Sequence, residues 1–521
     1  MNRRAWAWLI IIVGMIVSRA GFLEDVVYNI DEAEYAVAAD ALDQGWLPGV
    51  DLLGTTKPPG IVLFFKLLFL IFGRSLTVIH AAHILLMIAA GMLVVELAIA
   101  LWDRSAAIPA AMLFWMVANS FNIPHEIIAL NVESPGIVCI AAALCLVWSK
   151  PNNRNALIGA GVLLGLATIF RQSFLAFALP TAAAIWFRFT DRVRGIILAF
   201  AGFVFIWLPI LIWYGAKGGL GWAWDSWIRY PMTYAADTGW SGFLQALYLN
   251  SADFCLQVFV PVIMALGGVV LLWKERHTPR AQFLFLLGIA SFAALCSGSR
   301  FFGHYWIQTF SVLALWGIPA WFAFARSSLA KKWILGAALF IGCAVALLHF
   351  PTWRYWDDYA PPRGISFFAL GKEQEELAVG AFAREHTKPD ETIAVWGYCP
   401  QIYYHAHRLP GVRDFLCHYI TGFSPGTFSP FEERARRAFG HPRAQQMFIE
   451  DLERREPKYV FDLVQIDNYT FTFFNYSLRT YPELADYLRQ NYLPEGEIGR
   501  VPVYRRRTPE DQWWPTKQDI E

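Results

Sequence analysis

Long apolar runs separated by short polar loops dominate the first 350 residues, and the pattern predicts about eleven membrane-spanning helices. Several of these runs are shorter than the roughly 20 residues that a spanning helix prefers. A further run, 61–72, lies between Lys57 and Arg74 and is expected to form an interfacial helix on the membrane surface. The predicted spans are 6–23, 76–101, 105–123, 133–149, 155–170, 174–187, 195–214, 254–273, 282–298, 304–325 and 333–350.

Composition agrees with a polytopic α-helical membrane protein. The chain is 56% hydrophobic and 16% charged, whereas soluble domains are about 25% charged. The net charge of +1 gives no reason to expect a nucleic-acid partner. Arg3 and Arg4 before an apolar run resemble a signal peptide, but no small-residue cleavage site precedes the acidic Glu24-Asp25, so we expect a retained first helix.

Basic residues concentrate in alternate loops and therefore predict the orientation. By the positive-inside rule, the richer loops are cytoplasmic, which places the N-terminus inside and the C-terminal region outside the cytoplasmic (inner) membrane. The loops predicted to be cytoplasmic carry Arg3, Arg4, Arg104, Lys150, Arg154, Arg188, Arg192, Arg194, Lys274, Arg276, Arg280, Arg326, Lys331 and Lys332.

From about residue 351 the composition changes, which divides the chain into a transmembrane domain, 1–350, and a second domain, 351–521. The transmembrane domain includes the outer-face loop 24–75. Strands are expected at 392–396, 458–464 and 500–504, and helices at 373–385, 400–407 and 432–451, which together indicate a small extracytoplasmic α/β domain. Neither GxGxxG after a strand nor GxxxxGK[ST] occurs, so no nucleotide-phosphate loop is predicted. Cys399 and Cys417 are candidates for pairing if this domain faces an oxidising compartment.

The most informative polar cluster follows the first span. Asp31-Glu32 begins a predicted helix over 32–42, and Lys57-Pro58-Pro59 precedes the interfacial helix. Ionised groups near hydrocarbon are costly, so such a cluster predicts a functional site. Two structural alternatives remain open: Asp31 could cap the helix, with Glu34 at the third helical position, and Lys57 could reach from the membrane to water.

Other outer-face residues extend this candidate site. Glu133 begins a span, although a helix-start acid is also favoured by the helix dipole. Arg171 is an isolated cation that could also reach to water. Arg300 and His304 are four residues apart, so they share a face if one helix includes both, and they predict a phosphate cradle. Tyr35, Asn131 and Tyr305 are candidate substrate contacts.

Two further features leave alternatives open. His125 and Glu126 lack metal-ligand spacing, so no cofactor is predicted, and a divalent cation is retained as a minor alternative. The aromatic residues of loop 215–250 are compatible with either a membrane-interface belt or sugar stacking. They are Trp222, Trp224, Trp227, Tyr230, Tyr234 and Trp240.

Together, Asp31-Glu32, Lys57-Pro58-Pro59, Glu133 and Arg300-x-x-x-His304-Tyr305 resemble the GT-C membrane glycosyltransferases. The resemblance covers roughly residues 1–330 and is nearest to the bacterial protein O-mannosyltransferase-like and lipid A aminoarabinose transferase families. It implies a polyprenyl-phosphate sugar donor and an acceptor reached from outside. It also implies an acid/base role for Asp31, a donor-phosphate contact for Lys57 and a second acid at Glu133, while Arg171 stands where some relatives have Lys.

The chemistry of inverting sugar transfer is compatible with these residues. Asp31 would accept the acceptor proton, with Glu32 or Glu133 orienting the acceptor. The phosphate-binding cations would be Lys57, Arg171, Arg300 and His304. A transporter or flippase is one alternative, but no internal repeat is evident and the charges lie at the outer ends of spans. A non-catalytic envelope assembly protein is another. The sequence names neither the sugar nor the envelope acceptor.

Overall fold

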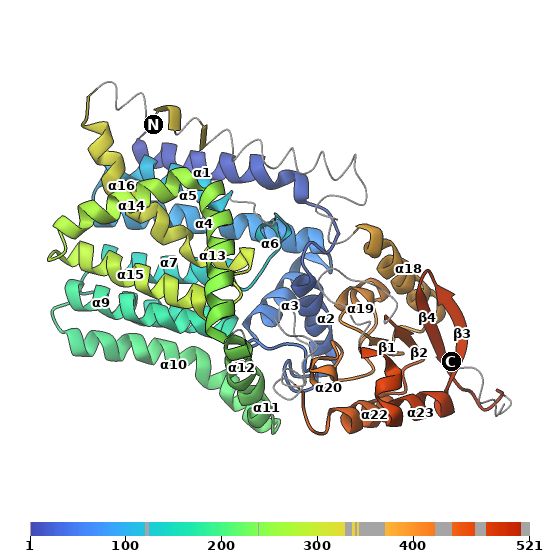
Figure 1. The fold of residues 1–521 in the computed structure, drawn as a ribbon. Helices are drawn as coiled ribbons and strands as arrows, with labels where there is room; N and C mark the ends of the chain where they lie inside the picture. Colours follow the sequence, from blue (N-terminus) through green and yellow to red (C-terminus); the bar gives the residue numbers. More distant parts are fainter. Residues whose placement is uncertain are drawn as a thin grey trace.

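The computed structural model describes residues 2–119, 124–237, 239–328, 336–338, 341–342, 370–422, 440–463 and 476–511. A large helical body occupies one end of the molecule and a smaller domain with a β-sheet occupies the other (Figure 1). The mostly helical membrane architecture and the small C-terminal sheet predicted from the sequence are both confirmed.

The helical body contains the predicted apolar segments as far as they lie within the described residues. Within the described residues, five helices are long and apolar enough to cross a membrane, and a bent pair, Gly239–Gln257 with Phe259–Lys274, would make a sixth if it is one span. The predicted count of about eleven spans stays a prediction, since 333–350 lies almost entirely outside the described residues. The main helices are α1 (Arg3–Arg19), α4 (Leu76–Leu101), α5 (Ala107–Ala118), α7 (Glu133–Ser149), α8 (Arg154–Phe170), α9 (Ala178–Arg188), α10 (Arg192–Ala216), α13 (Gly239–Gln257), α14 (Phe259–Lys274), α15 (Pro279–Cys296) and α16 (Phe310–Ala325).

Small residues allow the helices of the body to pack closely. A Cβ atom at Gly161 of α8 would lie 1.8 Å from the carbonyl oxygen of Ala199 in α10. One at Gly202 of α10 would lie 2.2 Å from the carbonyl oxygen of Ile158 in α8. Such close backbone approach at small residues is typical of helices that associate within a membrane. On the outer surface of α10, Phe200 and Phe205 remain exposed, as expected for side chains that contact lipid.

Two shorter helices lie between the helical body and the C-terminal domain (Figure 1). The predicted helix over 32–42 forms as α2 (Ile30–Ala41), and nearly all of its side chains are buried. The predicted interfacial helix forms as α3 (Gly60–Phe72), which exposes Leu67, Leu70, Ile71 and Phe72. Because most of α2 is covered, the buried Glu32 and Glu34 meet other protein groups or an internal cavity rather than bulk water.

The C-terminal domain has a four-stranded sheet in the order β1-β2-β4-β3. The first two strands are parallel, and the remaining pairs are antiparallel. Strands β1, β2 and β4 match the predicted ones, whereas β3 was missed because its central residues are polar and exposed. The strands are β1 (Ile393–Trp396), β2 (Tyr459–Asp462), β3 (Tyr492–Ile498) and β4 (Val501–Arg506).

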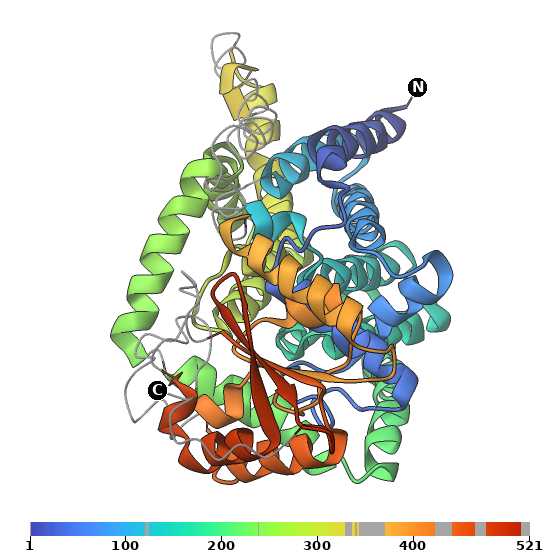
Figure 2. The same ribbon diagram turned by 90° about the vertical axis from the view of Figure 1, so that its right-hand side faces the viewer.

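Helices cover both faces of this sheet (Figure 2). On one face, Phe382 of α18 (Leu370–His386) packs edge-on against Phe461 of β2. On the other, Phe448 of α22 (Ala444–Arg455) packs against Trp396 of β1. The remaining helices are α19 (Pro400–Ala406), α20 (His418–Thr421) and α23 (Pro482–Asn491). Cys399 and Cys417 are both buried free thiols, so the pairing considered for them is not formed.

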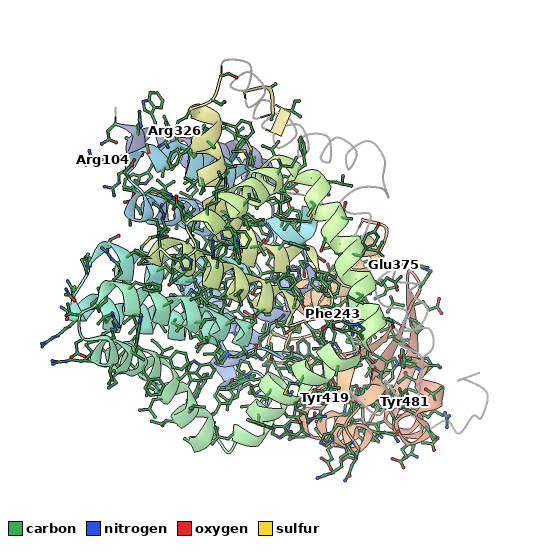
Figure 3. The ribbon with its side chains drawn as sticks, turned by 60° about the vertical axis from the view of Figure 1, so that its left-hand side comes forward. Arg104, Phe243, Arg326, Glu375, Tyr419 and Tyr481 are labelled. Atoms are coloured by element: carbon green, nitrogen blue, oxygen red, sulfur yellow. The ribbon has the colours of Figure 1, made fainter. Side chains whose placement is uncertain are left out.

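The C-terminal domain is fastened to the loops around α2. The backbone N–H of Leu53 donates to the carbonyl oxygen of Arg413 at 2.8 Å. Arg74 donates to the carbonyl oxygen of Tyr404 at 3.1 Å and stacks its guanidinium on the Tyr404 ring. Arg104 and Arg326, both predicted to be cytoplasmic, lie at the end of the helical body far from this domain (Figure 3).

Candidate functional site

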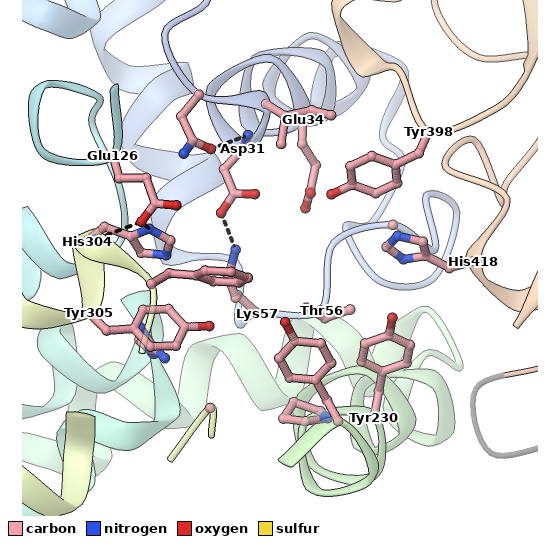
Figure 4. A pocket seen from close by; sticks show the side chains of 18 of the residues that line it. Asp31, Glu34, Thr56, Lys57, Glu126, Tyr230, His304, Tyr305, Tyr398 and His418 are labelled. Atoms are coloured by element: carbon pink, nitrogen blue, oxygen red, sulfur yellow. Dashed lines mark hydrogen bonds and ion pairs between the residues drawn. The ribbon is translucent and has the colours of Figure 1, made fainter. Parts of the chain in front are cut away.

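A cavity of about 580 Å³ lies where the helical body meets the C-terminal domain. Asp31, Lys57 and His304 line it from the helical body, and Tyr398 and His418 line it from the C-terminal domain (Figure 4). Of the predicted catalytic and phosphate-binding residues, Asp31, Lys57, Arg171 and His304 line this cavity together. The C-terminal wall was not predicted.

Asp31 and Lys57 form the centre of the cavity. Lys57 Nζ donates to Asp31 Oδ2 at 2.8 Å, and the Tyr35 hydroxyl donates to the same oxygen at 3.0 Å. Lys57 also contacts the Tyr35 hydroxyl. Tyr35 follows Asp31 by four residues and so lies one turn along the same face of α2. The rigid Pro58-Pro59 turn, which precedes α3, holds the lysine opposite this face.

The charge state of Asp31 follows from two opposing effects. Burial raises the pKa of its carboxyl, but the charge of Lys57, then that of His304, and the hydrogen bonds from Lys57 and Tyr35 lower it further than burial raises it. The net pKa lies below the usual value, so Asp31 is ionised at neutral pH. Burial lowers the pKa of Lys57, but Asp31 and Glu34 raise it above its usual value. The pair is therefore a carboxylate beside an ammonium group.

Glu34 opens onto the same cavity and has the opposite charge state (Figure 4). Burial raises its pKa, Lys57 lowers it and Asp31 raises it, with a net value of about 8. It is therefore mostly protonated at neutral pH and can donate a hydrogen bond. In the sequence, Glu34 was a candidate only for a helix cap. Its spacing of three residues from Asp31, which places both on one helix face, was the signal that could have identified it.

The helix cap is formed by Asn29 and Glu32. The Asn29 side chain accepts from the backbone of the first turn and the Glu32 carboxylate accepts from the backbone N–H of Asn29, so the cap considered for Asp31 and Glu34 is wrong. Glu32 also accepts from the backbone N–H of Leu130 at 2.9 Å and lies 3.2 Å from His80 Nε2. These contacts direct Glu32 away from the cavity, whereas its neighbour Asp31 faces it. The predicted catalytic role of Glu32 has no support in this geometry.

Glu133 is the counter-ion of Arg171. It is fully buried and forms an ion pair with the Arg171 guanidinium, which stacks 4.0 Å from the centre of the Tyr305 ring. Arg171 and Tyr305 line the cavity, while Glu133 lies behind them. Asn131 is also fully buried outside the lining, where its amide donates to the carbonyl oxygen of Glu126 at 3.3 Å. Neither Glu133 nor Asn131 therefore reaches the cavity, where a substrate would contact it.

His304 faces the cavity, but Arg300 does not. The backbone N–H and ring Nδ1 of His304 both lie 3.1 Å from the Glu126 carboxylate. Arg300 is paired instead with Asp237 at 3.1 Å. The condition for a shared helix face is not met, because the helical segment η6 (Gly303–Thr309) begins after Arg300.

The backbone before η6 explains this separation. Ser299 and Phe301 have left-handed φ angles of 56° and 55°, a conformation that breaks a right-handed helix. Arg300 stands between these two residues and is turned toward α12 (Tyr230–Asp237), where it stacks on Tyr234. The phosphate cradle predicted for Arg300 together with His304 therefore does not form as one unit.

The C-terminal wall contains a column of stacked rings. Tyr398 lies 4.9 Å from His418 at an interplanar angle of 13°, and His418 lies 6.0 Å from Tyr230 at 16°. Tyr230 belongs to α12 of the helical body, so the column joins the two parts of the protein. Of the aromatic residues in 215–250, Trp227, Tyr230 and Tyr234 line the cavity.

A divalent cation was only a minor alternative in the sequence. In this part of the chain, no group of three or more His, Cys, Asp or Glu side chains has an arrangement that could hold a metal ion. Separately, the charged lining includes Asp31, which can accept a proton, and the two cations Lys57 and Arg171.

The chain is similar to known membrane glycosyltransferases in part of its sequence and in its fold. The family model for dolichyl-phosphate-mannose-protein mannosyltransferases matches residues 56–213. No curated protein matches the chain. The crystal structure of ArnT from Cupriavidus metallidurans bound to undecaprenyl phosphate is similar, with a TM-score of 0.58 and 15% identity, and the match covers 96% of this chain and 98% of that one.

Archaeal enzymes share the fold as well. The apo oligosaccharyltransferase of Archaeoglobus fulgidus is similar with a TM-score of 0.54 and 15% identity, over 88% of this chain and 69% of that one. The oligosaccharyltransferase AglB of the same organism, in complex with an inhibitory peptide and a dolichol-phosphate, has a TM-score of 0.54 and 14% identity, over 98% of this chain and 75% of that one. The resemblance inferred from the sequence is confirmed: the chain has the fold of the GT-C membrane glycosyltransferases and matches the mannosyltransferase family model over residues 56–213.

Proposed function

We propose that this protein transfers a sugar from a polyprenyl-phosphate-linked donor to a hydroxyl group of an envelope acceptor, with Asp31 as the base. The observation that carries this proposal is the ionised Asp31 held against Lys57 on the wall of a cavity that Arg171 and His304 also line. The likeness to ArnT with undecaprenyl phosphate and to AglB with a dolichol-phosphate supports the choice of donor.

The cations of the cavity suit a phosphate leaving group. Among the described residues, Lys57 and Arg171 are the positively charged side chains that line the cavity. His304 adds a polar ring, which is held in place by its contact with Glu126. Charge develops on the donor phosphate as the bond to the sugar breaks, and fixed cations stabilise that charge in a site from which water is excluded. Removing one such group typically costs about 3 kcal/mol in the transition state.

The reaction needs one proton acceptor. The acceptor hydroxyl oxygen attacks the anomeric carbon and forms the new glycosidic bond, while the bond from that carbon to the phosphate oxygen breaks. Its electron pair leaves with the polyprenyl phosphate, and the hydroxyl proton passes to Asp31. Tyr35, hydrogen-bonded to Asp31, orients the carboxylate. Glu34 remains protonated and therefore does not compete for this proton at neutral pH.

Donor binding would also activate the base. In the free protein, Lys57 forms an ion pair with Asp31 and lowers the pKa of the Asp31 carboxyl. A donor phosphate that accepts a hydrogen bond from Lys57 adds negative charge close to Asp31 and weakens the attraction between the two residues. Both effects raise the pKa of Asp31 and make it a stronger base when donor is present.

The proposed site lies at the outer face of the cytoplasmic membrane. The loops richest in Lys and Arg predict the cytoplasmic side. Arg104 and Arg326 of these loops lie far from the C-terminal domain, and the cavity is next to that domain (Figure 3). A lipid donor anchored in the outer leaflet would thus present its headgroup to the cavity, and the C-terminal domain would be extracytoplasmic.

The proposal is tested with the purified full-length protein in lipid nanodiscs. Undecaprenyl phosphates linked to mannose, glucose and aminoarabinose serve as donors, and release of undecaprenyl phosphate is measured. Asp31→Asn should reduce turnover by about 10²- to 10⁴-fold while undecaprenyl phosphate still binds. Asp43→Asn is the matched control, because Asp43 pairs with Lys66 at an exposed position outside the cavity lining.

Two results would contradict this assignment. Wild-type turnover by Asp31→Asn would remove Asp31 from the base role. Transport of the lipid between leaflets without release of undecaprenyl phosphate from any of the donors would favour a flippase.

A further inference from the structure

The cavity has two chemically different walls. The helical-body wall carries both of its cations, Lys57 and Arg171. The wall formed by the C-terminal domain has no Lys or Arg among its described lining residues and instead presents Glu376, Tyr398, Gln401, His405 and His418. A ligand that spans the cavity therefore meets positive charge on one side and mostly neutral hydrogen-bonding groups on the other.

Several polar atoms of the C-terminal wall are buried without a partner. Both ring nitrogens of His418, Nε2 of His405 and Oε1 of Gln401 have no hydrogen bond to any described residue. His418 is only 4% exposed, and all three residues line the cavity. A buried polar atom left unpaired costs about 1–3 kcal/mol, so such a group in a native protein calls for an explanation. A polar ligand in the cavity would supply the missing hydrogen bonds.

The charge states of these residues define which ligand suits them. Burial lowers the pKa of His418 to about 3 and, together with the nearby Arg74, that of His405 to about 4. Both rings are neutral at physiological pH, so each offers one N–H donor and one nitrogen acceptor. The Gln401 amide likewise donates and accepts. Hydroxyl groups, which also donate and accept, match this set, whereas a phosphate or carboxylate would be better recognised by cations.

The position of Asp31 assigns the wall to the acceptor. Asp31 and Lys57 lie between His304 and Tyr305 on one side and Tyr398 and His418 on the other (Figure 4). In an inverting displacement, the acceptor approaches the anomeric carbon from the side opposite the leaving group. If the phosphate leaves toward Lys57 and Arg171, the acceptor must come from the side of the C-terminal domain.

The stacked rings add a rigid surface suited to a sugar. The nearly parallel Tyr398, His418 and Tyr230 fix one another, and Tyr230 anchors the column to the helical body. Aromatic rings next to hydrogen-bonding groups match the apolar faces and polar rims of a sugar ring. Glu376, the one carboxyl group of this wall among the described residues, can accept a hydrogen bond from a hydroxyl.

We propose that Gln401, His405 and His418 of the C-terminal domain form the acceptor subsite, and that the acceptor is an uncharged glycan. This inference rests on the proposed glycosyltransferase function. The domain thus selects the acceptor and delivers one of its hydroxyl groups to Asp31, while the donor is recognised by the helical body.

The first experiment separates acceptor recognition from donor chemistry. His418→Phe keeps a flat ring for the stack but removes both nitrogens. His441→Phe is the control, since His441 packs against the Trp222 ring outside the cavity lining. Neutral hexose oligosaccharides serve as acceptor probes in nanodiscs. His418→Phe should raise the acceptor KM about tenfold, as expected for the loss of one or two hydrogen bonds. Release of undecaprenyl phosphate to water without acceptor should change less than about twofold.

The opposite results overturn the inference. These are an unchanged acceptor KM in His418→Phe, an equal loss in acceptor-free hydrolysis, or transfer by the wild-type protein to the bisphosphorylated lipid A disaccharide or a Ser/Thr peptide but not to the neutral oligosaccharides.

A binding measurement tests the acceptor subsite independently of the proposed reaction. Saturation-transfer NMR with the same oligosaccharides should detect contact with the wild-type protein and with Asp31→Asn, and a loss of contact in His418→Phe. If no donor is cleaved but this binding pattern holds, the transferase proposal fails and the glycan subsite stands. If donor is cleaved but the oligosaccharides contact none of the proteins, the subsite fails and the transferase stands.

Discussion

Lys57 Nζ lies 2.8 Å from Asp31 Oδ2, although 26 residues separate them in the chain. The contact joins the first turn of α2 to the turn before α3 and determines the charge state of both groups. It means that the proposed base and a proposed phosphate ligand are one electrostatic unit in the free protein. A change in either residue should therefore alter the titration of the other.

Replacing Lys57 with Met should shift the pH dependence of activity. Without the ammonium group, burial dominates and raises the pKa of Asp31, so the acidic limb of the profile of kcat/KM should move to higher pH. Turnover at pH 7 should fall by about 10²-fold, since a charge that stabilises the leaving group is also lost. The assay is release of undecaprenyl phosphate between pH 4 and 9. Lys66→Met, which removes an amine paired with exposed Asp43, is the control; an acidic limb that stays in place in Lys57→Met would exclude the coupling.

Replacing Glu34 with Gln should stabilise the protein in a pH-dependent manner. Glu34 has a folded-state pKa of about 8 against an ordinary value of 4.5. Below pH 4.5 both the folded and unfolded states are protonated. Between pH 4.5 and 8 the folded state binds the extra proton, so wild-type stability falls as the pH rises, and above pH 8 the loss is constant. Gln removes this dependence.

The melting temperature of Glu34→Gln relative to wild type should therefore be unchanged near pH 4.5, rise up to pH 8 and then level off. The gain should correspond to at most about 5 kcal/mol. Differential scanning fluorimetry in detergent measures it. Glu483→Gln, at an exposed position in the first turn of α23, should show no such trend. A difference that is the same at every pH would show that Glu34 is ionised in the folded protein.

Glu133→Gln should act mainly on stability, because Glu133 is the buried partner of Arg171. Breaking a buried ion pair from one side typically costs 3–5 kcal/mol, so a clear fall in melting temperature is expected. The double variant Glu133→Gln/Arg171→Met removes both charges and should recover part of that loss. In contrast, if Glu133 is a catalytic acid, Glu133→Gln will lose turnover by about 10²-fold or more while its melting temperature stays near that of the wild type.

Arg171→Met should weaken undecaprenyl phosphate binding more than Arg300→Met does. Arg171 lines the cavity, whereas Arg300 is paired with Asp237 away from it. We expect a rise of about tenfold or more in the Kd for Arg171→Met, equivalent to at least about 1.4 kcal/mol. Arg300→Met and Asp237→Asn should resemble each other, with a loss of stability and less than about threefold change in Kd. Native mass spectrometry in detergent compares the three variants. A larger effect of Arg300→Met would return Arg300 to the phosphate site.

Local patterns in the chain were sufficient for much of the fold. Apolar runs longer than ten residues predicted most of the main helices, since a membrane requires every backbone polar group to be satisfied within a helix. The helix α13 (Gly239–Gln257) was missed: 215–250 was expected to be a loop, because its apolar residues are interrupted by polar ones. The alternation of strands and helices after residue 351 predicted the α/β domain, but β3 escaped because an exposed strand at the sheet edge lacks a regular apolar pattern. Helix boundaries at α2 and α3 agreed within two residues.

Within the candidate site, the sequence was more successful at naming residues that reach the cavity than at predicting which residues contact each other. Asp31, Lys57, Arg171, His304 and Tyr305 do converge on one cavity or its edge. The sequence did not decide which acid, Glu32 or Glu34, lines the cavity beside Asp31. The helix is capped by Asn29 and not by Asp31, so Glu32 is used in the cap and Glu34 faces the cavity. The same applies to Arg300, whose direction follows from the left-handed residues on either side of it.

The sequence by itself determined the membrane class and several charged residues of the cavity, because hydropathy, helix periodicity and the cost of ions near lipid all act over short stretches of chain. Only the tertiary structure decided the rest of the cavity wall. His418 and Tyr398 come to face Asp31 through packing between segments nearly 400 residues apart, and no local pattern records such a contact. Tertiary packing also determined which buried charges pair with each other and which of these pairs line the cavity, since burial and distance set the energy of each pair.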